Sequence, residues 1–102
     1  MTTEVVYNVS IGGFSISLEA WARMLALGYQ GEASAYNKYV YLEDCVRHNP
    51  ILVQVVKELG TKKASSPGSD LYIAKVSGPY RIEEYDGWES VKEPDDYKWI
   101  TP

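Results

Sequence analysis

Cysteine and histidine are almost absent from this 102-residue sequence, which contains one of each, Cys45 and His48. A single cysteine excludes an internal disulfide and a zinc cluster built from several thiolates of one chain. A serine–histidine–aspartate or cysteine–histidine arrangement would have to use the imidazole of His48. Enzymes that cleave nucleotides with a Walker motif need a lysine after the glycine loop, and no such lysine follows Gly12 and Gly13. The sequence therefore predicts no metal site, no cofactor and no catalytic residues, and so no enzyme.

Long apolar segments are also missing. No run approaches the roughly 20 residues that cross a membrane, and the first residues lack the basic and then apolar pattern of a secretion signal. Apolar residues make up 45% of the chain and charged residues 24%, which are ordinary fractions for a folded domain. We therefore expect one domain over residues 1–102, located in the cytoplasm and without contact to a membrane.

Basic residues are scarce near the end of the chain, where negative charge is concentrated. Residues 83–102 contain seven acidic residues against two lysines, a local charge of −5, while the whole chain carries −4. Direct binding to nucleic acid is disfavoured, because it requires a basic surface. An acidic segment is usually a solvated face, although it can also complement a basic partner.

The first predicted helix covers residues 18–27. Ser17 is a suitable N-cap for this helix, and Gly28 is placed to end it. Helical spacing predicts an apolar stripe that packs on a sheet, made of Leu18, Trp21, Ala22 and Leu25.

The second predicted helix covers residues 50–59. It has Asn49 as N-cap, Pro50 at its first position and Gly60 as its end. Its predicted apolar stripe consists of Ile51, Leu52, Val55, Val56 and Leu59.

Strands are indicated by alternation and by turn residues. Apolar and polar side chains alternate over residues 5–11, which predicts a strand with one buried face. The pair Asp86-Gly87 suits a type I′ turn and predicts a hairpin of residues 80–85 and 88–93. The other expected elements are strands over 39–42 and 71–76, an exposed loop over 61–70 and an extended acidic C-terminal segment over 94–102. Together they predict an α+β fold, with a small, mostly antiparallel sheet of four to five strands and two helices packed on one face.

Two helix starts are candidate anion sites. Gly12 and Gly13 lie between the first strand and the first helix, where backbone N–H groups and a helix dipole favour negative charge. The plainer interpretation is that these glycines only permit a tight turn. The second helix begins beside Arg47 and His48, whose cationic or potentially cationic side chains would also suit an anion.

Three separated motifs resemble a family of small proteins encoded by bacteriophages and some large DNA viruses. They are the strand that runs into the glycines and residues 12–17, the segment 47–60 around the second helix, and the hairpin segment 82–89. The chain departs from the family pattern at Ile11, at Asn49 and in its last residues. The resemblance implies a viral origin, and hence the host cytoplasm as location, and it leaves the activity open.

In this viral context, the first hypothesis is that the protein sequesters a nucleotide-derived signal of a bacterial antiviral defence. Phosphates would meet the helix starts and arginines, and a base would stack on an aromatic ring. The proposed ligand-binding residues are Gly12, Gly13, Phe14, Ser17, Arg47, Asn49, Arg81 and Trp88. Three of them also have a purely structural explanation: Phe14 as a core residue, Arg47 as a member of an ion pair and Trp88 as a cross-strand packing contact.

The second hypothesis is an acidic inhibitor of the anti-CRISPR type that binds a host defence protein and blocks its nucleic-acid channel. Its proposed interface consists of Tyr85, Glu89, Asp95, Asp96 and Trp99. We favour the nucleotide hypothesis slightly, because the loop and cap motifs resemble ligand geometry. Three tryptophans and nine tyrosines exceed what a small core hides, so either mechanism is compatible with a predicted homo-oligomer.

Overall fold

A computed structural model describes residues 2–42 and 47–94. Its central ladder pairs β1 (Thr3–Asn8) with β4 (Leu71–Val76) in antiparallel orientation, so that Thr3 lies opposite Val76 and Asn8 opposite Leu71. Both strands are rich in β-branched and aromatic residues, which suit a pleated surface. The predicted strand over 71–76 is confirmed, whereas β1 ends at Asn8, short of the predicted Ile11.

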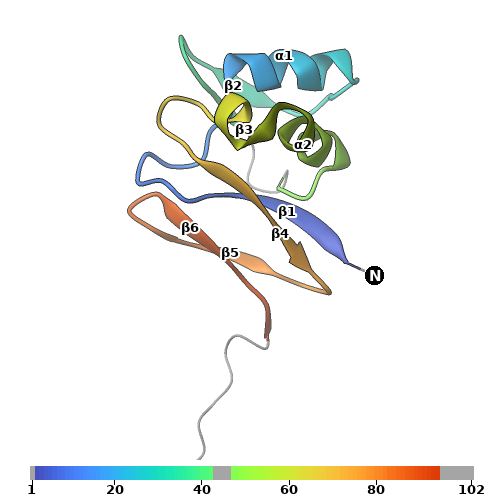
Figure 1. The fold of residues 1–102 in the computed structure, drawn as a ribbon, viewed down its shortest axis with the longest axis vertical. Helices are drawn as coiled ribbons and strands as arrows, with labels where there is room; N and C mark the ends of the chain where they lie inside the picture. The colour runs from blue at the N-terminus through green and yellow to red at the C-terminus, as the bar shows by residue number, and fades with distance from the viewer. Residues whose placement is uncertain (1, 43–46, 95–102) are drawn as a thin grey trace, which may run out of the picture.

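Both helices lie on the same side of the β1–β4 ladder (Figure 1). In α1 (Leu18–Ala26) the Ser17 hydroxyl accepts a hydrogen bond from the Ala20 amide at 3.0 Å. In α2 (Pro50–Ala64) the Asn49 side chain accepts one from the Ile51 amide at 2.8 Å. Both predicted N-caps are confirmed, because each satisfies an amide that has no partner within its helix.

The predicted hairpin is also confirmed. It consists of β5 (Arg81–Tyr85) and β6 (Trp88–Lys92), joined by a turn in which Asp86 and Gly87 have φ of 51° and 88°. Positive φ at both turn residues is the property of a type I′ turn. Figure 1 shows the hairpin on the side of the β1–β4 ladder opposite to the helices.

A third ladder pairs β2 (Ala33–Ala35) with β3 (Val40–Leu42), again antiparallel. The predicted strand near 39–42 is confirmed, but β2 was not predicted, since Ala-Ser-Ala carries no strand signal. The α+β class is confirmed, with two helices and six strands among the described residues. The strands form three two-stranded ladders instead of one sheet of four to five.

The apolar core lies between the helices and the β1–β4 ladder. Its buried members are Val6, Phe14, Ile16, Ala20, Met24, Tyr29, Val40, Leu42, Leu52, Val53, Val55, Val56, Ala64 and Leu71. Val5 is fully buried as well as Val6, so the expectation of one buried face for β1 is wrong. The strand is covered by the helices on one side and by the hairpin on the other, which hides both faces (Figure 1).

Two details of the helices differ from the predictions. In α1 the exposed residues include Leu18 and Leu25, whereas Ala20 and Met24, one turn apart, face the core shared with α2. The α2 segment continues beyond Gly60 to Ala64, with a kink at Gly60, where φ is 81° and ψ is 163°. Gly60 therefore breaks the helix where the sequence predicted its end. The predicted exposed loop over 61–70 nevertheless begins with a further helical turn, in which Ala64 is buried.

Neither helix in the described part of the chain combines the length and the apolar character that a membrane span requires.

Candidate functional site

Arg47 and Glu89 form a buried ion pair at the centre of the site. The guanidinium donates two hydrogen bonds to the carboxylate, Nη1 to Oε1 at 2.6 Å and Nη2 to Oε2 at 2.8 Å. Arg47 is 5% exposed and Glu89 is 4% exposed. Two parallel bonds of this kind are the strongest arrangement that an arginine makes with a carboxylate. The pair joins residues 42 positions apart in the sequence.

Phe14 and Asn8 complete the surroundings of the pair. The guanidinium carbon of Arg47 lies 3.6 Å from the centroid of the Phe14 ring, a cation–π contact. The backbone amide of Asn8 donates to Glu89 Oε1 at 2.9 Å, and the Asn8 side-chain amide donates to the Gly87 carbonyl at 2.9 Å. The carboxylate thus receives bonds from both the Arg47 segment and β1.

Local structure positions both partners. The Val6 amide donates to the Arg47 carbonyl at 2.8 Å, which fixes the backbone that precedes α2 against β1. Glu89 lies opposite Glu84 in the hairpin, so the two side chains point to the same face. Alternation along β6 places Trp88 on the other face, while Glu89 points inward.

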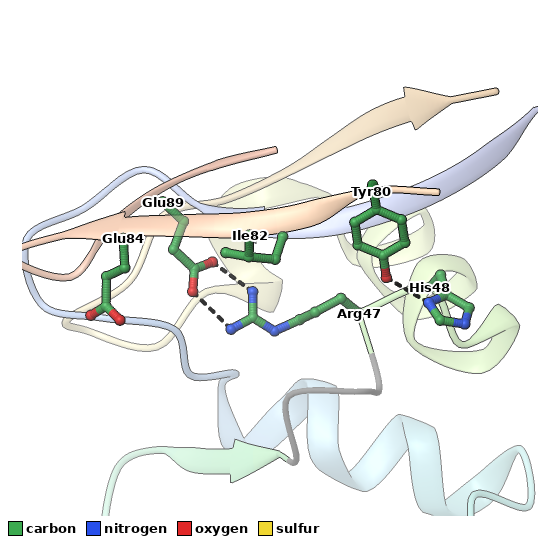
Figure 2. A pocket seen from close by; sticks show the side chains of 6 residues that line it. All are labelled: Arg47, His48, Tyr80, Ile82, Glu84 and Glu89. Carbon is green, nitrogen blue, oxygen red and sulfur yellow. Dashed lines mark hydrogen bonds and ion pairs between the residues drawn. The ribbon is translucent and has the colours of Figure 1, made fainter. Parts of the chain in front are cut away.

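An open cleft of about 450 Å³ lies beside the pair, between the hairpin and the start of α2. It is lined by Arg47, His48, Tyr80, Ile82, Glu84 and Glu89, which Figure 2 shows converging from the two segments. His48 Nδ1 and the Tyr80 hydroxyl share a hydrogen bond of 2.5 Å. Two carboxylates face one guanidinium here, so the charge of the lining favours a cationic group over a phosphate.

The Nε atom of Arg47 is buried and has no hydrogen-bond partner among the described residues. Its positive charge is nevertheless balanced by Glu89 and covered by Phe14. No group of three or more histidine, cysteine, aspartate or glutamate side chains that could hold a metal ion occurs within residues 2–42 and 47–94.

Of the predicted ligand-binding residues, the structure brings together Phe14 and Arg47. Ser17 and Asn49 cap their helices, so their side-chain oxygens are already engaged. Arg81 is exposed and donates to Glu83 at 3.1 Å, and Trp88 lies at the tip of the hairpin, 52% exposed. The eight residues therefore do not form one pocket.

The glycine loop is explained by close packing. A Cβ atom at Gly12 would lie 1.9 Å from the Gly68 carbonyl oxygen, closer than any side chain tolerates. The loop therefore packs its backbone against the backbone of Gly68. This geometry supports the tight-turn interpretation of Gly12, while Gly13 supplies a positive φ of 86°.

The residues of the predicted protein interface also differ in their surroundings. Glu89 is buried and paired, so it does not contribute an exposed carboxylate. Tyr85 is 81% exposed. Asp95, Asp96 and Trp99, like most of the predicted extended segment over 94–102, lie outside the described residues.

Two residues of the site had not been singled out as binding residues: Asn8 and Tyr80. A sequence signal existed for Asn8, because an amide between the apolar residues Tyr7 and Val9 of a strand needs hydrogen-bond partners when it is buried. The inward position of Glu89 also follows from alternation in β6, since Glu89 shares a face with Val91. His48 and Tyr80 are 32 residues apart, and nothing local indicates their contact.

Comparison with protein-family models, with curated proteins and with solved structures gives no match to this chain.

Proposed function

We propose that this chain is a non-enzymatic binding protein of a virus that docks on a host defence protein through the tip of its β5–β6 hairpin. The observation that carries the proposal is the exposure of three large apolar side chains at this tip. Ile11 is 77% exposed, Tyr85 81% and Trp88 52%. Exposed apolar groups gathered in one place are typical of protein interaction sites.

Backbone contacts bring these three residues to the same end of the molecule. Tyr85 and Trp88 are cross-strand partners that flank the turn. A Cβ atom at Gly87 would lie 2.4 Å from the Ile11 carbonyl oxygen, so the turn and the loop around Ile11 are in close contact. Tryptophan and tyrosine are the residues most often found as anchors of protein interfaces. The buried Arg47–Glu89 pair fixes the hairpin behind this tip.

The charge around the tip indicates the kind of partner. Glu84 and Asp86 are exposed beside Tyr85, and residues 83–102 carry a local charge of −5 in the sequence. An acidic rim around aromatic anchors complements a basic surface and speeds association with it. A nucleic-acid-binding channel of a defence effector is a surface of this kind.

Phosphate binding at Arg47 has less support, because its guanidinium is buried and already balanced by Glu89. A phosphate that displaced Glu89 from the guanidinium would leave a buried carboxylate with only the Asn8 amide as partner, which costs several kcal/mol.

The test compares the double variant Tyr85→Ala/Trp88→Ala with Tyr72→Ala, which removes an exposed tyrosine of β4 that does not belong to the hairpin. Each tagged chain is used to capture proteins from host cells with active antiviral defences, and the captured protein is then purified for binding measurements. We expect the double variant to lose at least about 30-fold in affinity, as loss of a hot spot of about 2 kcal/mol implies. Tyr72→Ala should stay within about twofold.

Two further measurements complete the test. Circular dichroism must show that the double variant is folded, and added nucleic acid should compete with the chain for the captured protein. The proposal fails if no protein is captured, or if the captured protein binds the double variant as tightly as the unmodified chain.

A further inference from the structure

A second cleft, of about 450 Å³, lies on another part of the molecule, where the glycine loop meets the β2–β3 hairpin. Its lining includes Gly12, Ser15, Lys38, Tyr39, Tyr41 and Ser66. Among the described residues that line it there is one lysine and no carboxylate, in contrast to the cleft beside Arg47. Its volume falls in the range of about 300–1,000 Å³ that is usual for small-molecule sites.

Tyrosine rings form one wall of this cleft. Tyr39 and Tyr41 contact each other edge to face, with centroids 5.1 Å apart. Tyr36 stacks on Tyr39 at 5.1 Å with an interplanar angle of 26°, and so supports that ring. Tyr41 is partly exposed on the short strand β3. Rings that are held in place by their neighbours can stack with a planar ligand at little entropic cost.

A cation and hydroxyl groups lie next to these rings. Lys38 is exposed in the turn between β2 and β3, where the Tyr36 amide donates to the Tyr39 carbonyl at 2.8 Å. Lys38 takes part in none of the ion pairs found in the described part of the chain. On the opposite wall, the hydroxyls of Ser15 and Ser66 are 2.6 Å apart and fix that side of the cleft.

We propose that this cleft binds a mononucleotide, with its base against the tyrosine rings and its phosphate on Lys38. Aromatic faces accept any base, because every base has a π-face. Lys38, which pairs with no carboxylate within residues 2–42 and 47–94, is a suitable point charge for a phosphate. The cleft shares no lining residue with the hairpin tip, although Gly12 of the cleft and Ile11 of the tip are neighbours in the glycine loop.

The probes are AMP, adenosine and inorganic phosphate, each titrated separately by calorimetry. We expect AMP to bind saturably and more tightly than adenosine or phosphate alone, because only AMP can contact both the tyrosine rings and Lys38. Lys38→Ala should weaken AMP binding by about tenfold or more and change adenosine binding by less than about twofold. Tyr41→Ala should weaken both ligands by about tenfold, whereas Tyr41→Phe, which keeps the ring, should retain adenosine binding.

Lys75→Ala is the matched control, because it removes an exposed lysine of β4 that does not line the cleft. Backbone amide shifts in nuclear magnetic resonance spectra locate the ligand, and we expect the changes at Gly12, Lys38 and Tyr41. The proposal is overturned if AMP does not bind, if Lys75→Ala weakens AMP as much as Lys38→Ala, or if the shifts map to the cleft beside Arg47.

Discussion

At the scale of single residues, the Arg47–Glu89 pair is the most consequential contact of the molecule. Both groups are removed from water, and their mutual attraction is what compensates for this desolvation. A buried pair of this kind contributes little net stability compared with apolar residues of the same size. Removal of only one of the two side chains is costly, because the other charge then stays buried without its partner.

The first prediction is that Glu89→Ala lowers the free energy of unfolding by about 3–5 kcal/mol. The variant leaves the Arg47 guanidinium without its carboxylate and the Asn8 amide without its acceptor. Urea denaturation followed by circular dichroism measures the change. Glu84→Ala, which removes the exposed carboxylate opposite Glu89, should change stability by no more than about 0.5 kcal/mol. Equal effects of the two variants would contradict the assigned role of the pair.

A second prediction concerns the exposed pair of Arg23 and Glu58, which links α1 to α2. Hydrogen bonds from the Arg23 and Gln54 side chains hold the pKa of Glu58 below its ordinary value. The contribution of Glu58 is therefore present at neutral pH and is lost as the pH falls through its lowered pKa. We expect Arg23→Ala to raise the Glu58 pKa toward its ordinary value, measured by a carboxyl carbon titration. Arg81→Ala, at a distant exposed pair, should leave that pKa unchanged.

At the scale of elements, the kink in α2 depends on one glycine. The φ and ψ of Gly60, 81° and 163°, fall in a region that other residues rarely adopt. The kink allows the last turn of α2 to place Ala64 in the core, and the Ala64 carbonyl accepts a hydrogen bond from the Ser17 amide at 2.9 Å. The two helices are therefore connected at this point.

We accordingly predict that Gly60→Ala destabilises the protein by about 1–3 kcal/mol, through backbone strain alone, because nothing lies within 4 Å of the added Cβ. Thermal unfolding provides the measurement. Gly78→Ala is the control, since its Cβ also meets open space and its φ is not positive. An unchanged melting temperature for Gly60→Ala would contradict this account of the kink.

The elements that the sequence predicted are those with local signals. Capping by Ser17 and Asn49 and the turn at Asp86-Gly87 depend on neighbouring residues only, and all three are confirmed. Gly60 was predicted to end the second helix, and its φ and ψ do interrupt the helix there. The further turn to Ala64 was missed, because nothing local in the sequence indicates that Ala64 is buried in the core. β2 was missed because its residues have no strand preference, and pairing with β3 decides its conformation.

The candidate site was less predictable, because its contacts join distant segments. Arg47 and Phe14 were both expected near a ligand, and they do meet. Glu89, expected on an acidic surface, is the partner that neutralises Arg47. Which carboxylate reaches a given arginine depends on how the hairpin packs on β1, and that arrangement has no local signature in the sequence.

At the scale of the whole molecule, the described elements form three layers: helices, β1–β4 ladder and β5–β6 hairpin (Figure 1). The helices and the ladder share the apolar core. Asn8 and Arg47 hold the hairpin by hydrogen bonds to Glu89 and Gly87, and the hairpin also covers Val5 of β1. No residue of β5 or β6 belongs to the apolar core, and regions outside the core open more readily than the core.

Rates of amide hydrogen exchange should therefore differ between the hairpin and the β1–β4 ladder. We predict that Glu89→Ala increases exchange in β5 and β6 by at least about tenfold more than in β1 and β4, as loss of a docking contact of more than 1.4 kcal/mol implies. Exchange under native conditions, followed by mass spectrometry of the peptides, gives the exchange rates of the variant and of the unmodified protein. A uniform increase across all strands would show that the hairpin and the ladder unfold as one unit.

The coupling of Arg47 to Glu89 also has an evolutionary consequence. A single substitution at either position leaves a buried charge without its ion-pair partner. Replacement of both residues by apolar ones need not lower the stability of the fold. Related sequences should therefore keep or replace the two positions jointly, and this covariation would identify members of the same lineage even where the exposed hairpin tip has diverged.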